Sequence, residues 1–253
     1  MIASPARAHA PGGRRQGLSG FSRLSLEGWR FWLADELVPC AGELLVGLRQ
    51  AQRSPAHGLG GRQSAFPVQA GGSALFLRLC RRGGLMRLLA ADLYLGVAPR
   101  PLAELRTMVE AARRGLAVTQ PMGAAVKWLL PGLYRGLFLT RALAGMTLWD
   151  FIRTDDDPQV RAHVLAEARR TIDEIHQAGL FHADLNLCNL FVARNGERLS
   201  VVVLDLDKAR FYPRPLGPAL RRANLRRLLR SARRLDPGER FLDRRALELL
   251  GAS

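Results

Sequence analysis

Three polar side chains of the types needed for phosphoryl transfer lie close together in the sequence. Asp184 and Asn189 belong to residues 182–189 (HADLNLCN), and Asp205 follows after a short gap. A phosphotransferase uses one carboxylate to orient the attacking hydroxyl, and a second carboxylate and an amide oxygen to hold Mg²⁺ on the nucleotide. These residues therefore predict a catalytic Asp184 with metal ligands at Asn189 and Asp205.

Each of these residues also has a purely structural interpretation. Asp184 alone would suit a loop that caps a turn, and Asn189 would suit the first residue of a strand. Their occurrence together with Asp205 favours chemistry. We expect His182 to brace the loop by hydrogen bonding rather than to act as a base. For Asp207 the sequence allows two roles, a second metal contact or a solvated acid.

A predicted hairpin explains why Asn189 and Asp205 should meet. Apolar residues 190–192 and 199–204 flank Asn195-Gly196, a strong hairpin signal. If these strands pair, the start of one and the end of the other lie at the same end of the hairpin. A helix with its N-cap at Asp157, closed by Gly179, precedes residue 182.

Upstream residues are suited to binding a nucleotide. Gly60 and Gly61 can present backbone N–H groups to phosphates. Arg78 ends a predicted strand pair and can bind phosphate while pairing with Glu104, which lies on a predicted helix over residues 99–115. The alternative is a surface arginine and a solvated glutamate.

Composition narrows the class of protein. The chain has 253 residues, 48% of them hydrophobic, and a net charge of +16, which fits a globular protein with a phosphate-rich partner. Residues 219–234 predict a basic amphipathic helix, suited to an anionic membrane surface or simply to solvent. No aromatic platform or known motif accompanies the charge, so we expect no nucleic-acid binding. No targeting signal or membrane span is predicted, and three scattered cysteines predict free thiols.

Taken in order, several segments resemble protein-kinase-like folds and, more narrowly, the lipopolysaccharide core kinases. Within that family, Asp184-Leu185-Asn186 is more similar to the enzymes that act on 3-deoxy-D-manno-octulosonic acid (Kdo) than to those that act on heptose. The matching segments are residues 60–65, 77–85, 103–106, 182–189, 204–207 and 223–231.

The resemblance implies an α+β, two-lobed fold. We expect a flexible basic tail over residues 1–20 and an N-terminal extension over 21–57, irregular over 21–47. A small antiparallel-sheet N-lobe with one helix should occupy residues 58–143, and a mainly helical C-lobe residues 144–253.

The resemblance also implies an enzyme that uses ATP and Mg²⁺. It would phosphorylate a Kdo hydroxyl, the 4-hydroxyl, on a Kdo-bearing lipid A precursor at the cytoplasmic face of the inner membrane. Alternatives are a kinase of this fold that acts on heptose or another alcohol, and a non-catalytic basic binding module. Three positions depart from ordinary protein kinases: Arg78 replaces a lysine, Asp207 a glycine, and Ala183 the arginine that senses activation-loop phosphorylation. Regulation by that phosphorylation is therefore not expected.

Overall fold

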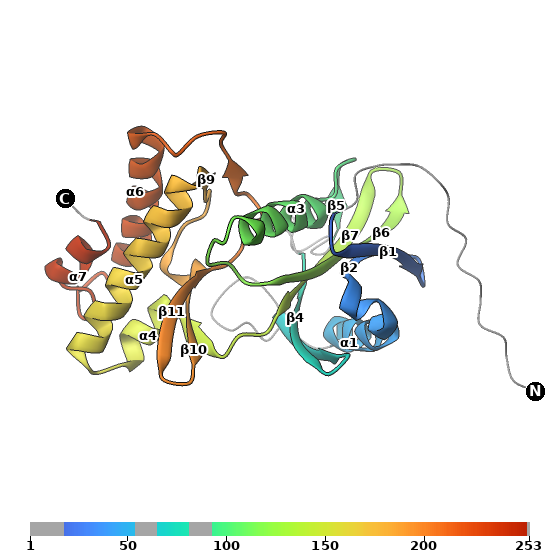
Figure 1. Cartoon of the computed structure of the whole chain (residues 1–253), viewed down its shortest axis with the longest axis horizontal. Helices are drawn as coiled ribbons and strands as arrows, with labels where there is room; N and C mark the ends of the chain where they lie inside the picture. The colour runs from blue at the N-terminus through green and yellow to red at the C-terminus, as the bar shows by residue number, and fades with distance from the viewer. Residues whose placement is uncertain (1–17, 54–64, 81–92, 252–253) are drawn as a thin grey trace, which may run out of the picture.

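The computed structural model describes residues 18–53, 65–80 and 93–251. Its N-terminal half forms a large sheet with helices α1 and α3, and its C-terminal half is mainly helical (Figure 1). This arrangement confirms the predicted α+β, two-lobed fold. No described helix has the length and apolar character needed to cross a bilayer.

The N-lobe is built on one antiparallel sheet of seven strands. The strand order is β1-β2-β6-β7-β4-β3, with β5 paired to β7. The strands are β1 (Phe21–Leu26), β2 (Trp29–Ala34), β3 (Ala65–Ala70), β4 (Ser73–Leu79), β5 (Tyr94–Leu95), β6 (Pro121–Leu130) and β7 (Leu133–Arg141).

The irregular structure predicted for residues 21–47 is wrong. β1 and β2 form an antiparallel hairpin, and β2 continues the sheet by pairing with β6. The 3-10 helix η1 (Asp35–Cys40) and helix α1 (Ala41–Arg53) follow, and α1 packs against β3. Trp29, Phe31 and Leu33 alternate with more exposed residues along β2 and are buried, which explains why this segment joins the sheet.

Helix α3 (Arg100–Arg113) joins the two lobes. It has a proline in its first turn, as predicted, and packs against β6 and β7. Leu105 and Met108 on its inner face belong to the same buried cluster as Ile172 and Ile175 of the C-lobe. The lobes therefore share a continuous hydrophobic core behind the site.

The C-lobe contains four helices within the described residues, together with short strands. The helices are α4 (Leu148–Thr154), α5 (Pro158–Gln177), α6 (Pro218–Leu235) and α7 (Arg244–Leu249). The strands are β8 (Gly145–Thr147), β9 (Leu180–Phe181), β10 (Leu190–Asn195), β11 (Arg198–Val203) and β12 (Arg210–Phe211), and η2 (Leu187–Asn189) is a 3-10 turn.

Helix α5 begins and ends where the sequence predicts. The Asp157 carboxylate accepts hydrogen bonds from the N–H groups of Gln159 (2.8 Å) and Val160 (3.3 Å). Gly179 has φ of 78°, and a Cβ there would lie 2.5 Å from the Tyr212 carbonyl oxygen, so both conformation and space require glycine. The chain leaves α5 through this turn and runs directly into residues 182–189.

Candidate active site

Arg78 and Glu104 form a buried ion pair between the sheet and α3. Arg78 lies at the end of β4, and its Nη2 donates to both carboxylate oxygens of Glu104, at 2.5 Å for Oε2. Glu104 is only 2% exposed. The alternative of a surface arginine and a solvated glutamate is therefore wrong, because α3 packs with Glu104 facing the sheet.

The same guanidinium reaches the loop that follows β11. Nη1 of Arg78 lies 3.3 Å from Oδ1 of Asp205. Burial lowers the pKa of Arg78, but the nearby carboxylates of Glu104 and Asp205 raise it more, so the guanidinium stays charged. Burial raises the pKa of Glu104 to about 7, against the attraction of Arg78. A fixed positive charge thus faces the predicted metal site.

A second ion pair, which sequence reasoning missed, lies beside the first. Both oxygens of Asp207 accept hydrogen bonds from Arg100, which starts α3, and the Nε to Oδ1 distance is 3.2 Å. Asp207 is therefore an ion-paired residue and not a freely solvated acid. The available signal was spacing, since Arg100 lies four residues before Glu104 and so shares its helix face.

The loop from His182 to Asn189 is braced by a neutral histidine. Nε2 of His182 donates to the Leu204 carbonyl oxygen (2.9 Å), so its Nδ1 is the acceptor for the N–H of Asp184 (3.2 Å). Burial lowers the pKa of His182, which keeps the ring uncharged. These contacts confirm the bracing role predicted for His182 and fix the backbone at Asp184.

Asn189 is held with its amide oriented. Its Nδ2 donates to the Asp184 carbonyl oxygen at 2.8 Å, which leaves Oδ1 available to a metal ion. Asn186 donates to the same oxygen (2.9 Å), and its own Oδ1 accepts from the N–H groups of Cys188 and Asn189. The loop is therefore closed by its own side chains.

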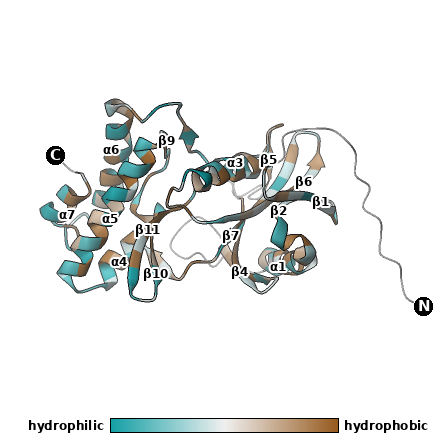
Figure 2. Cartoon of the chain, viewed as in Figure 1, coloured by the Kyte–Doolittle hydropathy of each residue, from teal (hydrophilic) through white to brown (hydrophobic). Residues whose placement is uncertain are grey.

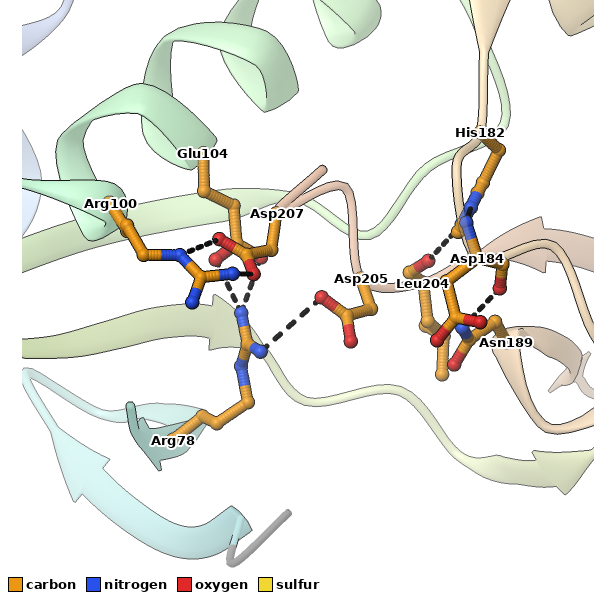
Figure 3. A network of polar contacts seen from close by, with 9 residues as sticks. All are labelled: Arg78, Arg100, Glu104, His182, Asp184, Asn189, Leu204, Asp205 and Asp207. Atoms are coloured by element: carbon orange, nitrogen blue, oxygen red, sulfur yellow. Dashed lines mark hydrogen bonds and ion pairs between the residues drawn. The ribbon is translucent and has the colours of Figure 1, made fainter. Parts of the chain in front are cut away.

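The predicted hairpin brings Asn189 and Asp205 to one end. β10 and β11 pair antiparallel from Leu190 opposite Val203 to Asn195 opposite Arg198, and the N–H of Leu204 donates to the Asn189 carbonyl oxygen (2.9 Å). Asp205 itself has φ of 55°, a left-handed conformation that is uncommon for aspartate and concentrates at functional sites. Figure 3 shows Asp205 between the Arg78 pair and the Asp184 loop.

Helix α6 holds the loop in place by hydrogen bonds from two residues, to which the sequence prediction assigned no role. Buried Asn224 donates to the His182 carbonyl oxygen (2.9 Å) and accepts from the His182 N–H (3.3 Å) and from Nε2 of His176 (3.2 Å). Two turns later, the Ser231 hydroxyl accepts from the N–H of Leu187 (3.1 Å). Their sequence signal is two polar residues seven apart on the buried face of a helix.

The residues present fit Mg²⁺. Asn189 and Asp205 offer oxygen ligands, the kind that this cation prefers, and nucleotide phosphates and water commonly complete such a site. Among the described residues, no group of three or more His, Cys, Asp or Glu side chains could hold a metal by itself. Gly60 and Gly61, predicted to cover the phosphates, lie outside the described residues, as do Arg81 and Arg82.

Comparison with known proteins identifies a family of kinases. The lipopolysaccharide kinase (Kdo/WaaP) family matches residues 47–249. A protein of Stenotrophomonas maltophilia (strain R551-3) named 3-deoxy-D-manno-octulosonic acid kinase is 34% identical over 235 residues, 83% of this chain and 89% of its own length. A protein of the same name from Xylella fastidiosa (strain M23) is 32% identical over 73% of this chain and 71% of its own length. The solved structure of WaaP in complex with acyl carrier protein has a similar fold, with a TM-score of 0.50, 16% identity and coverage of 80% of this chain and 79% of its own.

Proposed function

Because the chain belongs to the lipopolysaccharide kinase (Kdo/WaaP) family and is a kinase, we propose that its acceptor is a Kdo hydroxyl, the 4-hydroxyl, on a Kdo-bearing lipid A precursor. The observation that carries the chemistry is the convergence of Asp184, Asn189 and Asp205 opposite Arg78 (Figure 3). The names of the similar proteins support Kdo as the acceptor sugar.

In this proposal the residues act mainly by positioning and by charge. Asp184 accepts and orients the attacking sugar hydroxyl, on a backbone fixed by His182 and Asn189. Arg78 binds phosphate oxygens and stabilises the charge that develops on the transferred group. Mg²⁺ held by Asn189 and Asp205 would neutralise the phosphates of ATP.

We also propose that the enzyme works at the cytoplasmic face of the inner membrane. Helix α6 carries six exposed arginines, and none of them forms an ion pair with an acidic side chain in the described part of the chain. Each basic residue near an anionic surface contributes about 1 kcal/mol. The six are Arg222, Arg226, Arg227, Arg230, Arg233 and Arg234.

A competition between acceptors tests the proposal. Purified protein is incubated with Mg-ATP and an equal mixture of Kdo-bearing and heptose-bearing lipid A precursors, and the products are separated by mass. We expect one added phosphate on the Kdo-bearing acceptor, located by fragmentation at the 4-hydroxyl. Phosphate found only on the heptose would show that heptose, and not Kdo, is the acceptor. Phosphate on neither acceptor would overturn the proposal.

A further inference from the structure

Exposed apolar side chains gather at one corner of the N-lobe. Among the described residues seven large hydrophobic side chains are exposed, and four of them lie on β6 or in the segment from β5 to α3. These four are Leu95 (67% exposed), Val97 (90%), Leu129 (40%) and Leu130 (64%), and we refer to them as the N-lobe tip. Such a gathering is unusual for a surface that faces only water.

Strand pairing places these residues at one end of the sheet. Leu130 pairs with Leu133 across the turn between β6 and β7, and Leu95 pairs with Leu133 from the other side. The N–H of Gly96 donates to the Gly132 carbonyl oxygen (2.8 Å), which holds the segment containing Val97 against the turn. The tip therefore lies at the adjacent ends of β5, β6 and β7, and β5 and β6 carry exposed apolar residues there.

The next residues along the strands are aromatic and then basic. Trp128 pairs with Tyr134, and their rings lie 5.2 Å apart, while Tyr94 stacks on Tyr134 at 5.6 Å. Lys127 opposite Arg135 follows one pair farther from the turn. Figure 2 shows the end of the hairpin in the hydrophobic colour, with hydrophilic segments farther along its strands.

This sequence of layers matches the interface of a lipid bilayer. The exposed apolar side chains of the tip can enter the acyl region, the partly exposed Trp128 suits the headgroup level, and Lys127 can contact anionic headgroups, while the buried Tyr134 packs against Trp128 from within. We propose that the N-lobe tip inserts into the surface of an anionic phospholipid bilayer and is a second membrane contact besides α6. The inference rests on the proposed function, since it supposes a lipid-linked acceptor.

Vesicle binding tests the insertion directly. The full chain is mixed with vesicles of phosphatidylethanolamine and phosphatidylglycerol that carry brominated acyl chains, and tryptophan fluorescence is followed. We expect quenching that is largely lost in Trp128→Phe, and a vesicle partition constant about tenfold lower for Val97→Gln/Leu130→Gln than for wild type. The matched control Val46→Gln, on α1 and 52% exposed, should bind like wild type. Because Val97, Leu130 and Val46 are exposed, we expect the glutamine variants to keep the wild-type melting temperature.

Two results would overturn the insertion. One is a vesicle partition constant of Val97→Gln/Leu130→Gln equal to that of wild type. If the same variant is also a monomer where wild type is a dimer, the tip binds a second copy of the chain instead of a bilayer. The other is full quenching in Trp128→Phe.

An activity assay separates this inference from the proposed function. On an acceptor without acyl chains, the tip variant should match the wild-type rate, whereas on a vesicle-embedded acceptor it should be several-fold slower. If wild type is inactive on both acceptors, the proposed function is wrong, and the vesicle partition test of the tip still applies. If the tip variant and wild type have equal rates on the vesicle-embedded acceptor, membrane insertion of the tip is contradicted, whereas the proposed function is not.

Discussion

The two sides of the site are held by different kinds of interaction. On the N-lobe side, Arg78 and Arg100 form ion pairs with Glu104, Asp205 and Asp207. On the C-lobe side, the loop from His182 to Asn189 is held by neutral hydrogen bonds to its own side chains and to α6. One side is therefore held by charged groups, and the other by uncharged ones, of which the bonds to α6 are buried.

This difference separates a binding role from a positioning role. A charged pair at a partly exposed site can exchange a carboxylate partner for a phosphate oxygen, because both accept from a guanidinium in the same geometry. Buried neutral bonds have no such alternative partner, and breaking them leaves unsatisfied groups. We expect substitutions on the N-lobe side to change catalysis most, and substitutions behind the loop to change stability first.

The largest effect is expected for Arg78. In Arg78→Met/Glu104→Gln both charges of the buried pair are removed, and Asp205, which loses its contact with Arg78, is partly exposed to solvent, so the fold should survive. The rate should nevertheless fall about 10²- to 10³-fold, because the cation that stabilises the transferred phosphate is gone. Steady-state kinetics and thermal unfolding measure both quantities. Glu104→Gln alone keeps the cation and should lose much less activity; equal losses in the single and double variants would contradict the role of Arg78.

Asn224 tests the other side of the comparison. Asn224→Leu leaves the backbone groups of His182 and Nε2 of His176 without their partner, at about 1–3 kcal/mol for each buried group. We expect the free energy of unfolding to fall by about 2–4 kcal/mol in denaturant titrations. The neighbouring Leu225→Ala, which is only half-buried, provides a control with a smaller loss. Wild-type stability in Asn224→Leu would show that α6 does not brace the loop.

The Arg100 and Asp207 pair should show a smaller effect. A double-mutant cycle of Arg100→Gln and Asp207→Asn isolates the pair, whose side chains are 41% and 22% exposed. We expect a coupling energy of about 1 kcal/mol and a weaker apparent affinity for Mg-ATP, since the pair ties the Asp205 loop to α3. Additive effects of the two substitutions would mean that the contact does not position the loop.

The smallest effect concerns pH. Burial lowers the pKa of both His176 and His182, so the unfolded chain binds protons that the folded chain does not. This contribution to stability is complete above about pH 6.5 and is lost as the pH falls below it. In His176→Gln the loss between pH 6.5 and 5.5 should be smaller than in wild type, by at most about 1 kcal/mol. Identical pH profiles in denaturant titrations would show that His176 is not kept neutral by the fold.

Local signals in the sequence predicted the backbone geometry of the site. The Asn195-Gly196 turn fixes the register of β10 and β11, and that register alone brings Asn189 to the end of the hairpin where Asp205 follows. The cap at Asp157 and the glycine at 179 likewise depend only on neighbouring residues. Such features are predictable because their partners lie a few positions away.

Features that depend on distant partners were not predictable in the same way. Asn224 contacts a loop 42 residues earlier, and Arg100 pairs with a residue 107 positions later, so local spacing places each residue on a helix face but does not identify its partner. β2 is a different case, because the alternation of Trp29, Phe31 and Leu33 was a sufficient signal. Only the pairing of this strand with β6, far along the chain, lies beyond local spacing.

The most direct test of the account compares wild type with Asp184→Asn in one phosphoryl-transfer assay. Both proteins are incubated with Mg-ATP and Kdo-bearing lipid A precursor, and the mass of the acceptor is followed over time. We predict one phosphate added by wild type and a rate at least about 10²-fold lower for the variant, with an unchanged melting temperature. An equal phosphate gain with both proteins would contradict the catalytic role of Asp184, and therefore the central claim.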